Sequence, residues 1–273
     1  MHNLFQSWKY IFKNIWFVLP FAIVPAALLA LSLDYRALSV FVRGFFSGKP
    51  RLHFVEYFRV LSLIRIDSVL GGIYSVLAFV CVVLFSALML AFVEKHMRIG
   101  KRSLSGVYAG FWNILYSSFV ITLVYLLLYE LWALIFSTML FVIAAIPVTA
   151  LVYIFSIVAF LFFTYALLYV VTAFYLWLPC RQMTGFGFYD AFLYSYRLMV
   201  GIRWNLVLNF LISFIVALFA LCGAAMLPAV LFRIVGVILF VLLFLSFCIR
   251  METAYFETDK LDREDILHSY KEY

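Results

Sequence analysis

The chain has 273 residues, of which 68% are hydrophobic, 21% are aromatic and only 12% are charged. Water-soluble domains are about half apolar and a quarter charged, so this composition excludes an ordinary soluble protein and indicates a membrane protein. The net charge is +7, and the basic residues lie between the apolar runs. That placement indicates a role in membrane topology and contact with anionic lipid headgroups, not with nucleic acid.

The N-terminal region combines an amphipathic segment with an apolar run. Residues 1–13 carry apolar side chains at helical spacing, and residues 14–33 are almost uninterrupted in their apolar character. This run has two interpretations: a signal peptide cleaved near Ala26–Ala30, or a retained first span bent at Pro20 and Pro25. We favour the retained span, because its flanking segment resembles two later ones.

A polar-leaning region separates the first two spans. Residues 34–68 hold six basic and three acidic residues, and the apolar spacing over residues 54–64 predicts an amphipathic helix on the membrane. Residues 69–93 contain no charge and predict the second span. A basic junction, residues 94–102, precedes a second amphipathic segment around residues 104–111.

The middle of the chain carries a single charge, Glu130, between residues 111 and 178. As one straight helix this run would measure roughly 100 Å, against about 30 Å for the bilayer core, so it must turn. Pro147 is the predicted turn. The third span is then about 111–132, or 111–141 in a longer alternative, and the fourth is about 149–178.

The last third of the chain repeats the same layout. Residues 179–187 form a junction, residues 189–201 predict an amphipathic helix, and spans follow at about 204–226 and 229–249, separated by Pro228. Residues 250–273 hold four basic and seven acidic residues. They predict an acidic, water-exposed cytoplasmic tail with a short helix over residues 262–270.

Three junction tryptophans, Trp16, Trp112 and Trp204, lie 96 and 92 residues apart. Their spacing indicates an internal repeat, although tryptophan also marks membrane interfaces in general. Both interpretations predict the same all-α fold. It has six transmembrane helices arranged as three hairpins, each preceded by an in-plane amphipathic helix, in one domain over residues 1–249.

Charge asymmetry predicts the orientation of this domain. Each hairpin crosses the membrane twice, so the three amphipathic segments share one side. The segments on that side hold thirteen Lys and Arg residues, and the opposite segments hold seven. The positive-inside rule therefore places both termini in the cytoplasm.

The run DAFLYSYRLMVGIRWNLV, residues 190–207, resembles the pattern of the glycerophosphoryl diester phosphodiesterase membrane-domain family. The matching positions are Ala191, Ser195, Arg197, Leu198, Gly201 and Trp204. The tail METAYFETDKLDRED is also similar to the ends of such proteins, and the resemblance covers about residues 103–265. It implies a six-span protein of the bacterial cytoplasmic membrane. It does not imply phosphodiesterase activity, because that chemistry belongs to a separate soluble barrel in the family.

Catalytic chemistry has no recognisable residue set in this sequence. The four histidines, His2, His53, His96 and His268, are scattered over different segments, and no metalloprotease, P-loop or nucleophile-elbow motif is present. We therefore predict no enzyme activity, no catalytic residues, no metal site and no cofactor.

Two groups of charged residues are candidate functional sites. Glu130 is an interfacial anchor if the third span covers residues 111–132. If the span is instead shifted to about residues 118–141, Glu130 lies near mid-membrane and is an intramembrane polar site on a proton or substrate path. Arg197, Arg203, Lys101 and Arg102, with Lys95 and Arg98, gather at the predicted cytoplasmic face. They are either topology determinants that snorkel, or a site for anionic lipid headgroups.

These features predict a non-enzymatic integral membrane protein, a scaffold or accessory subunit that organises lipids or a membrane protein partner. The alternative is a small-molecule or lipid transporter, and an enzyme acting on lipid is a third candidate. A tightly packed bundle would favour the scaffold. A wide polar or lipid-filled cavity would favour the transporter.

Overall fold

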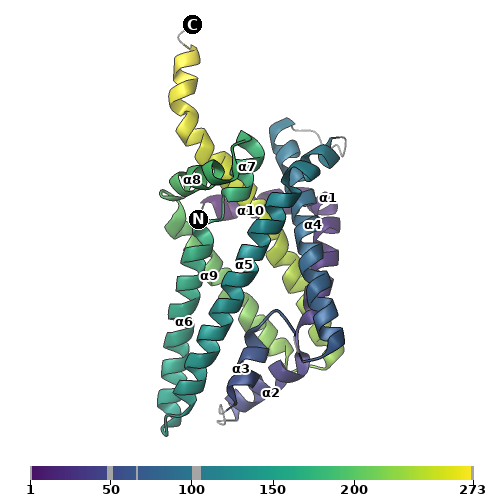
Figure 1. The fold of residues 1–273 in the computed structure, drawn as a ribbon, viewed down its shortest axis with the longest axis vertical. Helices are drawn as coiled ribbons and strands as arrows, with labels where there is room; N and C mark the ends of the chain where they lie inside the picture. The colour runs from purple at the N-terminus through teal and green to yellow at the C-terminus, as the bar shows by residue number, and fades with distance from the viewer. Residues whose placement is uncertain (1, 48–51, 66, 100–105, 272–273) are drawn as a thin grey trace.

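The computed structural model describes residues 2–47, 52–65, 67–99 and 106–271. Within those residues the chain is helical, without a β-strand (Figure 1). The helices are α1 (His2–Ser32), α2 (Tyr35–Phe46), α3 (Phe54–Leu61), α4 (Val69–Ile99), α5 (Val107–Ala144), α6 (Thr149–Ala173), α7 (Trp177–Thr184), α8 (Phe188–Met199), α9 (Arg203–Ala224) and α10 (Ala229–Lys271).

Six helical segments are long and apolar enough to cross a membrane. They are Ser7–Ser32, Val69–Arg98, Val107–Ala144, Thr149–Thr184, Arg203–Ala224 and Ala229–Asp259. An 18-residue window in each has a mean hydropathy of 2.2 or more. The chain therefore has the helices of a multi-pass membrane protein, one for each predicted span.

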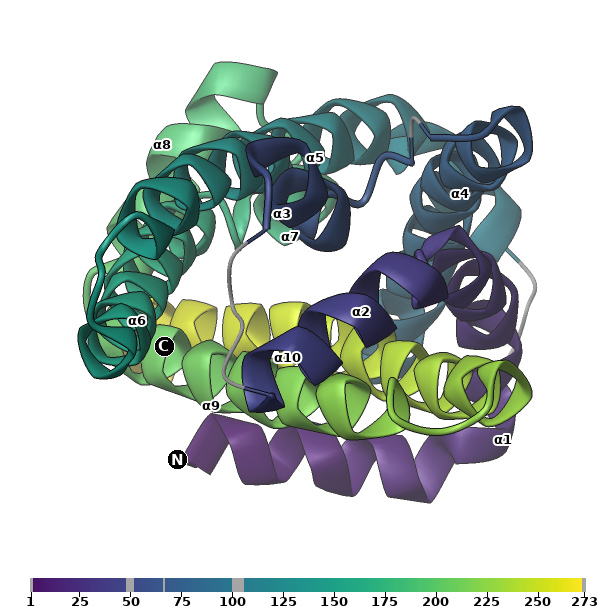
Figure 2. The same cartoon turned by 90° about the horizontal axis from the view of Figure 1, so that it is seen from below.

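The six long helices form a closed ring. Going around it, α1 contacts α4, α4 contacts α5, α5 contacts α6, α6 contacts α9, α9 contacts α10, and α10 returns to α1. Figure 2 shows this ring end-on, with α3 in front of the α5 side and α2 in front of the α10 side. Each long helix thus has one face turned toward a shared interior and another turned outward.

Helix α1 changes direction at Asn14, whose φ and ψ of −120° and 17° are not helical. The segment before this kink lies across the ends of neighbouring helices, and the segment after it runs along the ring (Figures 1 and 2). The second segment packs closely on α10: a Cβ added to Gly236 would lie 3.3 Å from that of Ala30. Small residues at such a crossing allow two helix backbones to approach.

Helices α2 and α3 close one end of the ring, which we call the closed end. Helix α3 packs on α5, and α2 contacts both α3 and α9, so the pair links two helices that α6 separates in the ring. Tyr57 of α3 is only 3% exposed and belongs to a buried cluster with Trp132 and Phe136 of α5. The expected amphipathic helix over residues 54–64 is thus the shorter α3, and α2 is an additional helix that the sequence analysis did not identify.

Two predicted elements differ from the structure. Helix α5 is continuous from Val107, so no separate in-plane helix precedes the third span within residues 106–144. Helix α10 runs without a break to Lys271, so residues 262–270 extend this helix beyond the candidate span Ala229–Asp259 instead of forming a separate helix. The predicted fourth span, 149–178, lies within the candidate span Thr149–Thr184, in which α6 ends at Ala173 and α7 begins at Trp177.

Candidate functional site: an apolar cavity and a polar pocket

A cavity of about 430 Å³ lies inside the ring. Its wall includes side chains from all six long helices, from the linker between α3 and α4, and from α7. Representative residues, one from each long helix in turn, are Leu29, Phe79, Leu126, Leu168, Phe214 and Phe244. A cavity of this size is within the usual range of ligand sites, about 300–1,000 Å³.

Most of the hydroxyl groups in this wall are hydrogen-bonded within the protein; the Thr122 hydroxyl is the one for which the described residues show no such bond. Tyr125 donates to the carbonyl oxygen of Phe174 at 3.1 Å, and Ser213 donates to that of Asn209 at 2.8 Å. The hydroxyl of Ser86 lies 3.0 Å from that of Ser118. Because these polar atoms have partners, the cavity offers an incoming ligand mainly hydrocarbon and aromatic surface, which suits a hydrocarbon chain.

Glu130 fastens the linker between α3 and α4 to α5. Its carboxylate accepts hydrogen bonds from the Ser62 hydroxyl at 2.8 Å, the Leu63 N–H at 2.9 Å and the Ile64 N–H at 3.1 Å. The neighbouring Tyr129 donates to the carbonyl oxygen of Leu61 at 2.9 Å. In this structure Glu130 therefore satisfies a stretch of non-helical backbone. The interfacial anchor and the intramembrane polar site both stay predictions.

Ion pairs hold the closed end together. Arg59 contacts Asp34 and Asp67, each at 2.5 Å, and Arg65 contacts Asp67 at 2.8 Å. Asp34 also caps α2 by accepting from the Ala37 N–H at 3.1 Å. The hydrogen bond from Arg65 holds the pKa of Asp67 below its usual value. Each of these carboxylates is thus paired inside the protein.

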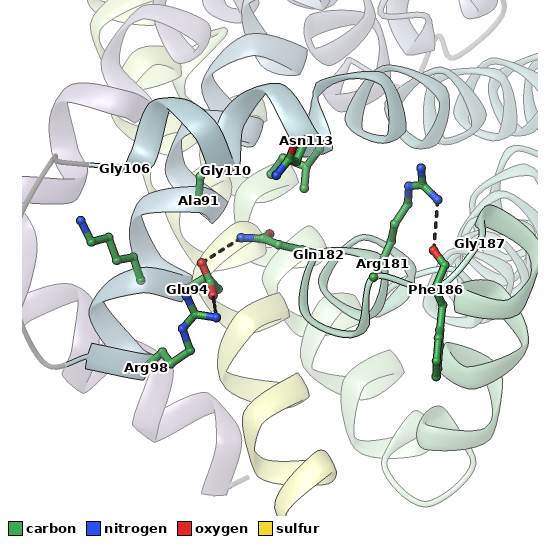
Figure 3. Close-up of a pocket in the computed structure, with 13 residues that line it drawn as sticks. Ala91, Glu94, Arg98, Gly106, Gly110, Asn113, Arg181, Gln182, Phe186 and Gly187 are labelled. Atoms are coloured by element: carbon green, nitrogen blue, oxygen red, sulfur yellow. Dashed lines mark hydrogen bonds and ion pairs between the residues drawn. The ribbon is translucent and has the colours of Figure 1, made fainter.

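The opposite end of the molecule, which we call the pocket end, contains a polar pocket of about 810 Å³ (Figure 3). It lies between the last turns of α4, the first turns of α5, and α7 with the loop that follows it. Its basic side chains are Lys95, Arg98 and Arg181, and Glu94 is the acidic residue among its described lining residues. Glu94 contacts Arg98 at 3.3 Å and Gln182 at 3.5 Å.

The predicted headgroup residues do not all belong to this pocket. Arg203 lies with its guanidinium 3.8 Å from the centroid of the Tyr169 ring and donates to the Tyr169 carbonyl oxygen at 3.0 Å, so that helix-to-helix contact occupies it. Arg197 is exposed on α8. Lys101 and Arg102 lie outside the described residues. The structure instead brings Lys95 and Arg98 together with Arg181, which is 83 positions further along the chain than Arg98.

Two buried charges on α10 lie in residues 250–273, where the sequence predicts a water-exposed tail. Arg250 is 1% exposed and Glu252 is fully buried. The reason is that α10 continues beyond Ile249, where the predicted last span ends, and packs on α1, α7 and α8. Arg250 donates to the Ser246 hydroxyl at 3.0 Å and faces the ring of Phe210, and both partners line the cavity. The carboxylate oxygens of Glu252 have no hydrogen-bond partner among the described residues.

The described residues contain no group of three or more His, Cys, Asp or Glu side chains that could hold a metal ion. No family model, curated protein or solved structure matches this chain. The resemblance to the glycerophosphoryl diester phosphodiesterase membrane-domain family stays a prediction.

Proposed function

We propose that this protein is a lipid carrier of the membrane, which binds the hydrocarbon chain of a lipid inside its ring of helices. The observation that supports this proposal is the cavity to which all six long helices contribute. A lipid carrier is a form of the lipid transporter, which is the alternative to the scaffold. The cavity favours the carrier, because a scaffold needs helix packing and outer surfaces but no ligand volume at its centre.

The nature of the wall selects the ligand. Aromatic surface comes from five phenylalanines of the wall: Phe79, Phe214, Phe240, Phe244 and Phe247. The hydroxyl groups of Tyr125 and Ser213 donate hydrogen bonds to partners within the protein. Removing apolar surface from water contributes about 25 cal/mol per Å², whereas a polar solute would lose hydrogen bonds with water that this wall does not replace. An acyl chain is therefore the expected occupant.

The proposal includes the membrane setting predicted from the sequence. The spans form three hairpins, the in-plane segments before the first and the fifth spans lie on one side, both termini lie in the cytoplasm, and the membrane is the bacterial cytoplasmic one. The pocket end is then the cytoplasmic end. Membrane lipids are the proposed partners, and a membrane protein that receives or supplies the lipid is compatible with the same arrangement.

A photoreactive acyl chain tests the proposal. The full chain in a neutral detergent is irradiated with a diazirine-labelled fatty acyl probe, and the labelled residues are mapped by mass spectrometry. We expect labels on cavity residues. Thr122→Trp, which fills the cavity from α5, should reduce this labelling at least several-fold.

The matched control is Leu127→Trp on the same helix. Leu127 is 60% exposed and is not among the cavity residues, so this substitution should leave the cavity labelling unchanged. Labels found only on outward-facing residues, at equal yield in both variants, would contradict the carrier and favour the scaffold.

A further inference from the structure

The polar pocket concentrates positive charge at the pocket end. Lys95 and Arg98 come from the last turns of α4, and Arg181 comes from α7. Figure 3 shows Glu94 and Gln182 directed toward each other and Arg181 beside the loop at Phe186. The described lining residues carry three basic side chains and one carboxylate, and Asp190, whose Oδ2 would lie 3.1 Å from a Cβ at Gly187, adds a second carboxylate at the rim. The balance is still positive, and an anion is favoured in such a concave site.

The start of α5 adds to this positive potential. Gly106 precedes the helix without a side-chain cap, and the first turn of α5 contains no acidic residue. A Cβ at Gly106 would lie 3.8 Å from the Lys95 ammonium nitrogen. The positive end of a helix dipole and a lysine ammonium thus meet in the same pocket, an arrangement that an anion between them stabilises.

Polar atoms at the pocket also have unused hydrogen-bonding capacity. Arg181 donates from Nη1 to the Phe186 carbonyl oxygen at 3.2 Å, while its buried Nε has no partner among the described residues. The exposed Asn113 lines the pocket from α5, and Gln182 lines it from α7. Together with Lys95 and Arg98 of α4, the pocket therefore has donors from three different helices.

We propose that this pocket binds a phosphate group, either in the headgroup of an anionic lipid or as free phosphate. A phosphate suits the site because it has several acceptor oxygens pointing in different directions, which guanidinium and ammonium groups can reach from separate helices. This inference rests on the polar pocket and is independent of the ligand proposed for the apolar cavity.

The position of the pocket fits a lipid headgroup in particular. Leu90 lines the apolar cavity and the next residue of α4, Ala91, lines the pocket. In α7, Leu178 lines the cavity and Arg181, one turn later, lines the pocket. The two sites follow each other along the same helices, as do the chain and the headgroup of a lipid.

Calorimetric titration of the full chain in a neutral detergent tests the inference. The probes are inorganic phosphate, dioctanoyl phosphatidic acid and dioctanoyl phosphatidylcholine. We expect the double variant Arg98→Gln with Arg181→Gln to bind phosphatidic acid about tenfold or more weakly than the wild type. Phosphatidic acid should bind the wild type more tightly than phosphatidylcholine.

The matched control is Arg36→Gln with Arg43→Gln, which removes two exposed arginines of α2 at the closed end. It should bind phosphatidic acid as the wild type does. The single variant Arg98→Gln changes an exposed position and should fold as the wild type does. The thermal unfolding midpoint of each variant shows whether a loss of affinity for phosphatidic acid comes from misfolding.

The outcomes separate the possible ligands. Equal binding of inorganic phosphate and phosphatidic acid identifies a free-phosphate site, and binding of the lipid alone identifies a headgroup site. Wild-type affinity in the double variant at the pocket end, or equal affinity for phosphatidic acid and phosphatidylcholine, would overturn the inference. Thr122→Trp should leave binding of inorganic phosphate unchanged, so a failure of the cavity proposal remains distinguishable.

Discussion

The two ends of the ring differ in the balance between their basic and acidic residues. At the closed end, the carboxylates of Asp34, Asp67 and Glu130 all accept hydrogen bonds from the protein. The donors to Asp34 and Asp67 include the guanidinium groups of Arg59 and Arg65. At the pocket end, three basic residues line an open pocket with one carboxylate among its described lining residues. Charges that are satisfied internally hold a fold together, whereas an excess of one sign in a concave site is available to a ligand. Charge substitutions should therefore change stability at the closed end and ligand binding at the pocket end.

The largest effect is expected at Asp34. Asp34→Ala removes both the α2 cap and a carboxylate whose side chain is 3% exposed and paired with Arg59. We expect unfolding to be easier by about 2–3 kcal/mol, measured by thermal or denaturant unfolding in detergent. Asp190→Ala, at an exposed position in the first turn of α8, is the control at the pocket end and should change stability by less than about 1 kcal/mol. Equal losses in the two variants would contradict the comparison.

Glu130→Ala is expected to have the next largest effect. It leaves the Leu63 and Ile64 N–H groups and the Ser62 hydroxyl without their acceptor, which should cost about 2 kcal/mol of unfolding free energy. Glu130→Gln keeps one accepting oxygen and should lose less. If the alanine variant unfolds like the wild type but loses lipid exchange, Glu130 lies on a substrate path instead of holding the linker.

At the pocket end, Glu94→Gln should strengthen ligand binding. The substitution removes the carboxylate that contacts Arg98 and raises the net positive charge of the pocket. We expect the affinity for phosphatidic acid to rise several-fold, about 1 kcal/mol, with little change in stability because the pair with the exposed Arg98 contributes little. Calorimetric titration measures this. A weaker affinity would indicate that Glu94 orients Arg98 for the ligand.

The smallest effect concerns pH. The pKa of Asp67 is lowered in the folded state, chiefly by its hydrogen bond with Arg65. A lowered folded-state pKa stabilises the protein above the unfolded value, about pH 4, and this contribution is lost as the pH falls through the folded value. The thermal unfolding midpoint of the wild type should therefore decrease as the pH is lowered below about 4. Asp67→Asn should lose less stability over the same pH range, because it lacks the carboxylate that titrates. Identical pH profiles would show that the ion pair does not contribute.

Much of the helical framework follows from local patterns. Uninterrupted apolar runs predict the long helices, and Pro147 predicts the turn between α5 and α6 because the residue before a proline resists helical geometry. Helix ends were harder to predict. Residues 250–259 are polar in sequence yet continue α10, since neighbouring helices bury them.

The candidate sites were less predictable than the spans. The sequence showed that Lys95 and Arg98 lie in a basic junction, but their partner Arg181 belongs to α7 and is brought near only by the closure of the ring. Arg203 belonged to the same predicted cluster, and its contact with Tyr169 removes it from that role. Similar positions relative to the membrane do not determine which side chains face one another.

By itself the sequence determined that the chain forms six helices long and apolar enough to cross a membrane, because the length and the apolar composition of a segment are local properties. Only the tertiary structure decided that the spans close into a ring with an apolar cavity, that α2 and α3 cover one end, and that a basic pocket forms at the other. Those features depend on which faces of distant helices meet. In a chain whose spans are apolar on every side, hydrophobic periodicity does not specify that choice.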